Sequence, residues 1–509
     1  MPDLDLLVLG SGVAGLSAAV RAAELHGMRV GVVTKAELQQ ATTRWAQGGV
    51  AAVLGGDPDS TDLHLADTLA AGAGLCDVDA VRVLVDEGPA RVHELIALGA
   101  TFDRDPDGQL QLAREGGHSL PRIVHAGGAA TGEEIERTLV EAVRESGRVV
   151  YERTFALDLI VEGGRCRGVT AADHQGDRIE VRAANVLMAT GGYGQLFSVT
   201  TNPSEATGDG VAMALRGGVA VADVEFEQFH PTALHHPAMP RPLLSEALRG
   251  HGALLRDAKG ERFVDELLSR DKVSRAIATT MLDQDVEHLW LDATRLEQFA
   301  ERFPTITAEL SAVGLDPARD WLPIAPAAHY SCGGLLADLD GATSLPGLWV
   351  AGEASCNGVM GANRLASNSL LDGMVFGPRV VEAIDRGVTG PTATGAMRSL
   401  LGGGDIGGRR LSLPPTGPRT ATDRDALQRT MMLNAGVLRT ADSLITAGAA
   451  CAVDIAGDDL PAWELRNLAT VGRALCAAAQ AREESRGAHT RNDFPEMRAD
   501  LRARLVFAG

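Results

Sequence analysis

The chain of 509 residues has no run of about eighteen apolar residues, so the sequence predicts no membrane-spanning helix. Only three of its 47 basic residues are lysines, and the basic residues are outnumbered by 67 acidic ones. The resulting net charge of −20 disfavours nucleic acid and anionic membrane surfaces as partners. The first expected strand begins within a few residues of Met1, which leaves no room for a secretory signal peptide. We therefore expect a cytoplasmic protein.

Paired cysteines are also lacking. The six cysteines are scattered and none forms a CxxC pair, so the sequence predicts reduced thiols and neither an iron–sulfur cluster nor a zinc site. We expect no metal. These cysteines are Cys76, Cys166, Cys332, Cys356, Cys451 and Cys476.

Strand and helix patterns alternate over residues 1–223, as in a doubly wound α/β sheet. Strands are expected at 149–151, 158–161, 165–172, 179–182 and 185–189. The sequence pattern differs over 224–337, where prolines accumulate and a helix is expected at 270–283. This difference indicates an inserted capping domain. The pattern of a strand followed by glycine, seen in the first domain, occurs again at 347–353. Residues 338–390 are therefore expected to complete that domain. Residues 391–420 are rich in Gly, Pro and Thr and are predicted to be a linker. Helical periodicity at 423–449 and 461–484 predicts a helical C-terminal domain over 421–509.

The most informative motif lies at the N-terminus, where an apolar strand at 6–9 runs into Gly10-x-Gly12-x-x-Gly15 and an alanine-rich helix. A second strand is expected at 29–33. Glycine at these sites allows a tight turn, close approach of backbone to a pyrophosphate, and close packing of helix on strand. A diphosphate is then bound at the helix N-terminus. An ordinary glycine-rich turn is the alternative, but the flanking strands favour a dinucleotide site.

Three further glycine-rich segments follow expected strands, at 42–49, 189–192 and 351–353. Each by itself is compatible with a plain turn. Their order around a GxGxxG fold favours FAD over a nicotinamide cofactor.

On these motifs the chain resembles the succinate dehydrogenase/fumarate reductase flavoprotein superfamily, from Leu6 to about Pro495. The resemblance implies an α/β protein in which a Rossmann-like FAD-binding domain is interrupted by an α+β capping domain and followed by a helical C-terminal domain. Within the superfamily the chain is most similar to the branch that oxidises L-aspartate. The stretches that carry the resemblance are AQGGVAA (46–52), REGGHS (114–119), TGDGVAMA (207–214), EFEQFHPTAL (225–234), SRD…SRAI (269–277), PAAHYSCGG (326–334), GANRLASNSLLDG (361–373) and ESRGAHTRNDFPE (484–496).

The resemblance also implies the FAD contacts. Thr42 stands where respiratory members carry a histidine bonded covalently to the flavin, and threonine cannot form that bond, so we expect non-covalent FAD. A helix starting near Ser367 would direct its N-terminus at the flavin and stabilise the reduced, anionic form; an ordinary N-cap serine is compatible with the same pattern. The implied contacts are Gly10, Ser11, Gly12, Val13, Ala14, Gly15, Lys35, Thr42, Thr43, Arg44, Trp45, Ala46, Gln47, Gly48, Gly49, Phe155, Ala156, Asp209, Glu353, Ser369 and Leu370.

The substrate residues come from the same resemblance. His230 and Ser245 are implied to bind one substrate carboxylate, and His329, Arg364 and Ser367 the other. Arginine, histidine and hydroxyl groups suit carboxylates, although each histidine taken singly could equally be structural. Ser245 replaces the more usual threonine and keeps the hydroxyl.

Arg270 is implied to be the residue that transfers the proton. A guanidinium with a pKa above about 12 is not readily deprotonated, so the family role requires a relay through neighbouring acids. Asp271 is one such acid in the sequence. From the residues alone, Arg270 could instead be a surface arginine paired with Asp271.

Glu115 separates the branches of the superfamily, because respiratory relatives typically carry an amide there. A carboxylate can pair with a substrate ammonium and should disfavour succinate and fumarate relative to L-aspartate. A surface glutamate paired with Arg114 is the alternative.

The expected function is therefore oxidation of L-aspartate to iminoaspartate, with hydride passing to FAD and with dioxygen or fumarate as reoxidant. The site would lie between the capping and FAD-binding domains, so that closing the cap excludes water. This reaction opens NAD (quinolinate) biosynthesis, and quinolinate synthase is a possible partner. The alternatives are a soluble fumarate reductase or succinate dehydrogenase flavoprotein subunit, and a non-catalytic flavin-binding partner.

Overall fold

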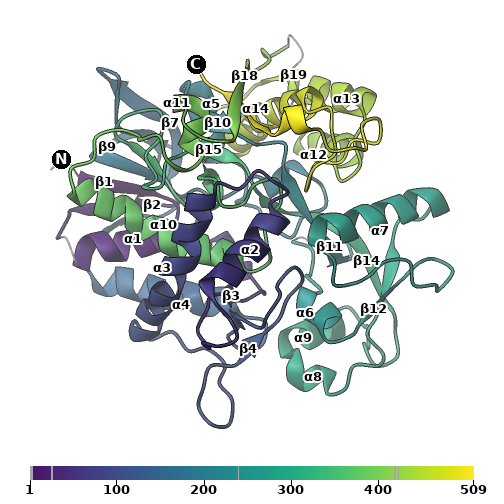
Figure 1. Ribbon diagram of the computed structural model, residues 1–509. Helices are drawn as coiled ribbons and strands as arrows, with labels where there is room; N and C mark the ends of the chain where they lie inside the picture. Colours follow the sequence, from purple (N-terminus) through teal and green to yellow (C-terminus); the bar gives the residue numbers. More distant parts are fainter. Residues whose placement is uncertain (1–3, 25–26, 239, 418–419, 422) are drawn as a thin grey trace.

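The apolar N-terminal run forms β1 (Leu4–Leu9), which lies inside the seven-stranded sheet of the computed structural model (Figure 1). It pairs in parallel with β2 (Val30–Val33) on one side and β9 (Arg178–Met188) on the other. β6 (Val149–Tyr151) extends the sheet beyond β2, and β16 (Leu348–Val350) pairs in parallel with β9. Parallel strands covered on both faces are apolar throughout. The structure describes residues 4–24, 27–238, 240–417, 420–421 and 423–509.

β9 belongs to two kinds of pairing. Its C-terminal half is parallel to β1, and its N-terminal half is antiparallel to β8 (Arg165–Ala172). β8 pairs in turn with β7 (Phe155–Glu162). The strands expected separately at 179–182 and 185–189 are therefore one continuous strand.

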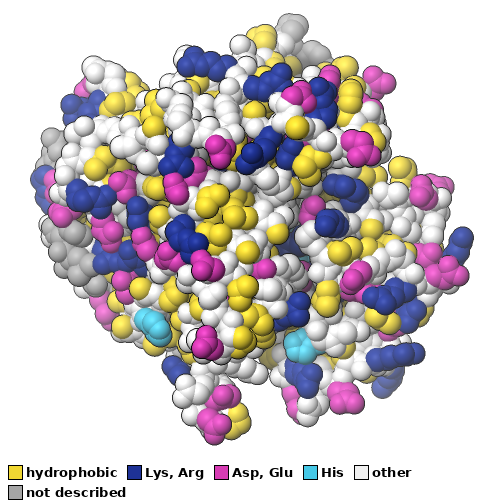
Figure 2. Space-filling model, in the orientation of Figure 1, with side chains coloured by type: hydrophobic (Ala, Val, Ile, Leu, Met, Phe, Trp, Pro, Cys, Tyr) yellow, Lys and Arg dark blue, Asp and Glu magenta, His cyan; other side chains and the backbone are white. Residues whose placement is uncertain are grey.

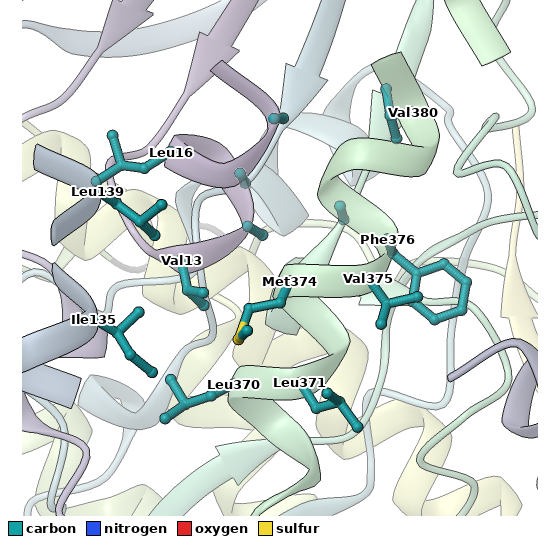
Figure 3. Close-up of a cluster of buried hydrophobic side chains, with 14 of the residues drawn as sticks. Val13, Leu16, Ile135, Leu139, Leu370, Leu371, Met374, Val375, Phe376 and Val380 are labelled. Atoms are coloured by element: carbon teal, nitrogen blue, oxygen red, sulfur yellow. The ribbon is translucent and has the colours of Figure 1, made fainter. Parts of the chain in front are cut away.

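Two helices pack directly against each other beside this sheet, α1 (Val13–Glu24) and α10 (Asn368–Asp385). Their contact depends on glycine, because a Cβ at Gly377 would lie 2.4 Å from the carbonyl oxygen of Ala14. Figure 3 shows the side chains that α1, α4 (Thr131–Glu145) and α10 bring into one buried cluster, among them Val13, Leu16, Ile135, Leu139, Leu370 and Met374.

The remaining elements of the first domain surround this core. Its other helices are α2 (Thr61–Ala71), α3 (Val78–Ala97) and α5 (Asp209–Arg216). A small antiparallel sheet consists of β3 (Val50–Ala51), β5 (Ile123–Val124) and β4 (Leu112–Ala113).

The segment expected to be a cap has its own four-stranded antiparallel sheet and its own hydrophobic cluster. It projects from the main body in Figure 1. Its strands, in spatial order, are β11 (Glu227–Leu234), β14 (Leu322–Ser331), β13 (Leu289–Asp292) and β12 (Leu254–Arg256). Its helices are α6 (Glu246–Gly250), α7 (Arg270–Gln284), α8 (Phe299–Arg302) and α9 (Pro304–Ala312).

The C-terminal region packs three helices onto the first domain: α12 (Arg424–Ala435), α13 (Ala441–Cys451) and α14 (Leu460–Ala481). The helical pattern over 423–449 is interrupted between Gly436 and Thr440, where Thr440 begins α13 with a capping box.

Strands from distant parts of the chain form a five-stranded sheet. The last strand, β21 (Ala503–Phe507), pairs with β10 (Val221–Ala222) of the first domain and with β18 (Gly407–Leu411), which lies within the expected linker. β15 (Gly334–Leu336) and β17 (Ser355–Cys356) complete it. α11 (Arg398–Leu401) precedes β18, and β19 (Thr420–Ala421) pairs in parallel with β20 (Asp454–Ile455).

Acidic and basic side chains are interspersed over the face of the molecule shown in Figure 2. Across the described ranges, no helix combines the length and apolarity needed to cross a membrane. All six cysteines are buried free thiols.

Candidate active site

A cavity of about 550 Å³ lies between the first domain and the cap. Its walls combine the N-terminus of α1 and the loop 40–49 with residues of β11, β14, α7 and the loop that precedes α6. A site assembled from two domains can be opened and closed by moving one of them.

Two glycines of the N-terminal motif, Gly10 and Gly15, lie where a side chain would clash with backbone. A Cβ at Gly10, where φ is +109°, would lie 2.2 Å from the carbonyl oxygen of Ala189, and one at Gly15 would lie 2.3 Å from that of Gly10. By contrast, Gly191 lines the cavity and a Cβ there would meet no described atom within 4 Å. The backbone is therefore close-packed behind the turn and open in front of it, which fits a bound dinucleotide.

Most of the residues expected to contact FAD line this cavity. Gly15 does not, because it packs behind the turn, and neither does Arg44, whose Nη2 donates to Glu133 at 3.2 Å on the surface. The residues that do are Gly10, Ser11, Gly12, Val13, Ala14, Lys35, Thr42, Thr43, Trp45, Ala46, Gln47, Gly48, Gly49, Phe155, Ala156, Asp209, Glu353, Ser369 and Leu370.

Lys35 joins the cavity wall to the C-terminal helices. Its Nζ donates to Asp209 at 2.9 Å and to Glu464 of α14 at 2.7 Å. Burial lowers the pKa of Lys35, but the two carboxylates raise it further, and the net shift is upward. Its positive charge is therefore permanent and already compensated by two acids.

Glu353, in the cavity wall, and Glu227, which is buried, both accept hydrogen bonds from Ser331. The backbone N–H of Ser331 donates to Glu353 at 2.9 Å, and the Ser331 hydroxyl donates to Glu227 at 2.8 Å. Burial raises the pKa of Glu353 to about 7, and burial together with the Glu353 charge raises that of Glu227 to about 8. Glu227 therefore holds its proton at neutral pH.

Arg270 begins α7 and is buried, with its Nε donating to Oε2 of Glu246 at 2.7 Å. Arg249 lies on the other side of this carboxylate, with its Nη2 3.5 Å from Oε1. The acid beside Arg270 is thus Glu246 and not Asp271, and the alternative of a surface arginine is wrong. The three side chains form a buried line of groups that can pass a proton.

Gln228 connects the two arginines of the cavity. Its Oε1 accepts from Arg364 Nη2 at 3.2 Å and from Arg270 Nη1 at 3.4 Å, while its amide nitrogen donates to Asn363. Arg364 also lies over the ring of Tyr330, 4.4 Å from its centroid. Burial lowers the pKa of Arg364 to about 10, so it stays charged at neutral pH although no described carboxylate pairs with it.

His230 and His329 face each other with ring centroids 5.1 Å apart. The Nδ1 of His230 accepts from the backbone of Thr232 at 3.2 Å, which leaves the proton on Nε2, a buried atom without a described partner. The Nδ1 of His329 lies 2.7 Å from the hydroxyl of Thr201. Burial, with the nearby arginines, lowers both pKa values well below the ordinary range, so both rings are neutral.

The hydroxyl of Ser245 lines the cavity and does not cap α6, whose N-terminus it occupies. Ser367 likewise precedes α10 without capping it. Its backbone is left-handed, with φ +61°, and its hydroxyl donates to Glu115 at 2.7 Å. The alternative of an ordinary N-cap is therefore wrong.

Glu115 is buried in the cavity wall beside His125, whose Nε2 lies 3.4 Å from Oε1. Arg114 donates to the carbonyl of His118 instead, so the alternative of a surface pair with Arg114 is wrong. Burial raises the pKa of Glu115, but His125, Arg270 and Ser367 together bring it below the ordinary value. The cavity thus holds an ionised carboxylate near its arginines.

Sequence reasoning missed Gln228, which lies within the quoted stretch 225–234, and Glu246 and Arg249, which closely follow Ser245. Alternation along a strand places Gln228 on the same face as His230, and this signal was available. Nothing local in the sequence brings Glu246 to Arg270, because they lie 24 residues apart.

Protein-family models match the chain as an FAD-binding flavoprotein, in agreement with the dinucleotide-binding turn described above. The family model described as an FAD binding domain matches residues 5–370, and the one described as Fumarate reductase flavoprotein C-term matches residues 456–505. The chain belongs to the FAD-binding flavoproteins of the succinate dehydrogenase and fumarate reductase family.

Similar sequences identify the family within this class of flavoproteins. L-Aspartate oxidase of Streptomyces coelicolor is 48% identical over 97% of this chain and 89% of its own length. The enzyme of that name from Mycobacterium tuberculosis strain H37Rv is 43% identical over 96% and 92%, and a chloroplastic one from Nicotiana tabacum is 40% identical over 99% and 83%. Within the class, the chain belongs to the L-aspartate oxidase family.

Solved structures show the same fold. A chain of E. coli quinol fumarate reductase superposes with a TM-score of 0.85 at 29% identity, covering 98% of this chain and 93% of that one. Sdh1 of Mycobacterium smegmatis gives a TM-score of 0.80 at 33% identity, covering 98% and 90%.

Proposed function

We propose that this protein oxidises L-aspartate to iminoaspartate in the cavity between the two domains. The proposal depends on two charged side chains of opposite sign that line the same cavity. Arg364 has no described carboxylate partner, and Glu115 is ionised with no described arginine or lysine bonded to it. A small molecule with two carboxylates and an ammonium would satisfy both. A simple dicarboxylate would satisfy only the first.

FAD, when bound, supplies the acceptor for the hydride that leaves the substrate Cα. The residues that would hold it are the glycine turn at 10–15 and the loop 42–49. Thr42 offers no ring nitrogen for a covalent link, so we propose non-covalent attachment. Acid precipitation of the yellow protein should leave the flavin in the supernatant; flavin in the pellet would contradict this.

Three groups would hold one end of the substrate and two the other. His329, Arg364 and Ser367 are proposed to bind one carboxylate, and His230 and Ser245 to bind the second. The unpartnered Nε2–H of His230 is a donor that the protein itself leaves free. Holding both ends restricts the substrate to a single orientation, which is a large part of catalysis.

Glu115 is proposed to bind the substrate ammonium. Its hydrogen bond from Ser367 holds the carboxylate in place, and its lowered pKa keeps the charge at neutral pH. An ionised carboxylate in the wall also repels dicarboxylates that lack nitrogen, which would set the preference for L-aspartate.

Arg270, Glu246 and Arg249 are proposed to carry the proton released from the substrate. The bond between Arg270 Nε and Glu246 Oε2 supplies an acceptor behind the guanidinium, so the arginine need not remain deprotonated. Arg249 then offers a continuation on the far side of Glu246.

Arg364 provides the test of this proposal. Arg364→Leu should abolish measurable turnover with L-aspartate, while Arg364→Lys should retain a small fraction because it keeps the charge and loses the planar fork. Full activity in the leucine variant would overturn the site, provided that flavin binding is unchanged.

We further propose dioxygen or fumarate as the electron acceptor, a place at the opening of NAD biosynthesis, and quinolinate synthase as a partner. A fumarate reductase activity is the second candidate, because the likeness to quinol fumarate reductase covers nearly the whole chain. Glu115 favours the oxidase. Comparing turnover of L-aspartate with dioxygen against reduction of fumarate by a chemical donor separates the two.

A further inference from the structure

The cations that line the cavity differ in whether an acid compensates them. Lys35 is held by Asp209 and Glu464, and Arg270 by Glu246. Among the described residues, two cavity-lining cations remain without a carboxylate partner: Arg364, which the proposed function uses, and Arg241, which it does not.

Arg241 lies on the loop of the cap that leads to Ser245. Its side chain is half-buried, and its Nε is fully buried without a described partner. Burial lowers its pKa, and no acidic group opposes that effect. An unpaired arginine in a protein of net charge −20, where acids outnumber bases, indicates an external anion.

Backbone hydrogen bonds hold the loop that carries Arg241. The N–H of Arg241 donates to the carbonyl of Thr200 at 2.9 Å, and the hydroxyl of the next residue, Thr201, contacts His329 at 2.7 Å. Pro242 accepts from the backbone of Leu234, which anchors the other side of the loop to β11. The backbone of Arg241 is therefore bonded to the residue that precedes Thr201, the hydrogen-bond partner of the histidine that the proposed function assigns to a substrate carboxylate.

We propose that Arg241 is the residue that first captures the carboxylate of an incoming amino diacid or dicarboxylate and delivers it to His329 and Arg364. This inference rests on the proposed function of the cavity. An acidic protein repels an anionic substrate as it approaches, and one uncompensated cation at the cavity wall offsets that repulsion. Arg241 accordingly acts on association and not on the chemical step.

The diphosphate of FAD is also anionic, so the experiment has to distinguish binding of a substrate carboxylate by Arg241 from binding of this diphosphate. The probe is succinate, whose association with the oxidised, FAD-loaded protein is followed by stopped-flow perturbation of the flavin absorbance over a range of salt concentrations. FAD affinity is measured on the same variants. Because succinate binding needs no turnover, a negative result here leaves the test of L-aspartate oxidation intact.

Arg241→Gln should slow succinate association roughly tenfold at low salt and flatten its salt dependence, which is the lower end of the range by which a charged cleft raises association rates. Arg241→Lys should keep most of the rate. Arg302→Gln is the matched control: it removes the same charge from an exposed position on the cap outside the cavity, and it should behave as the wild type.

Equal rates and equal salt slopes for Arg241→Gln and Arg302→Gln would overturn the proposal. It would also be overturned if Arg241→Gln weakened FAD binding while the loaded fraction bound succinate at the normal rate, because the guanidinium would then belong to the diphosphate.

Discussion

The Nε atom of Arg270 lies 2.7 Å from Oε2 of Glu246, and both side chains are buried in the wall of the cavity. Arg270 comes from the start of α7 and Glu246 from α6, so the contact exists only in the folded cap. Since a guanidinium holds its proton tightly in water, the proposed role of Arg270 in proton transfer depends on this carboxylate.

Removing that carboxylate should slow the chemical step. We expect Glu246→Gln to lower kcat at least about 100-fold, the range typical of lost acid–base catalysis, with a much smaller change in KM. Steady-state kinetics with L-aspartate checks this. Glu266→Gln is the matched control, because Glu266 is a buried glutamate of the cap that pairs with Arg262 and does not line the cavity. A kcat lowered equally by both substitutions would indicate damage to the cap and not loss of a relay.

Gln228 shares one amide oxygen between two arginines, and a carboxylate in its place would compete with the substrate for them. Gln228→Glu should therefore raise KM for L-aspartate more than about tenfold, since charge-assisted bonds are roughly twice as strong as neutral ones. Gln228→Leu removes the bridge without adding charge and should raise KM less. Equal KM values in the two variants would show that the added charge does not reach the arginines.

Glu115 should attract the substrate ammonium and repel dicarboxylates that lack one. Glu115→Gln is expected to raise KM for L-aspartate while sparing or improving reduction of fumarate, because a neutral amide no longer repels the dicarboxylate. Both activities are measured on the same preparation. Glu136→Gln, which changes a buried glutamate outside the cavity, serves as control. Unchanged L-aspartate kinetics in Glu115→Gln would remove Glu115 from the site.

Glu227 links stability to pH. Its pKa rises from the ordinary 4.5 to about 8 in the folded protein, so its neutral form stabilises the fold below pH 4.5, and this contribution is lost as pH rises toward 8. Each pH unit in that window weakens the wild type by up to about 1.4 kcal/mol through this group. Glu227→Gln should remove that part of the pH dependence.

Urea unfolding of the FAD-loaded proteins at pH 5 and pH 8 measures the effect. The variant should lose less stability between the two pH values than the wild type. An identical loss in both would show that Glu227 does not retain its proton on folding.

The local sequence pattern predicts many of the strands and helices correctly. The apolar run before the glycine turn predicts β1, and the expected strands at 149–151 and 165–172 match β6 and β8 in both bounds. The expected helix at 270–283 differs from α7 by one residue. These elements carry their own periodicity and termination signals, so tertiary structure adds little to them.

Other features depend on contacts between distant residues. β21 pairs with β10 and β18, which lie far away in the sequence, and no local pattern specifies those partners. The same holds for the site, where resemblance supplied His230, His329, Arg364 and Glu115. The acid that the sequence offers beside Arg270 is its neighbour Asp271, whereas the folded chain brings Glu246 to it.

The reduction of the flavin by substrate under anaerobic conditions tests the central claim most directly, because it needs neither an acceptor nor a coupled assay. Mixing the FAD-loaded protein with L-aspartate should bleach the flavin absorbance, and the same concentration of succinate should leave it oxidised. Flavin that stays oxidised with L-aspartate, or that is bleached equally by succinate, would contradict an amino diacid oxidase built on Arg364 and Glu115.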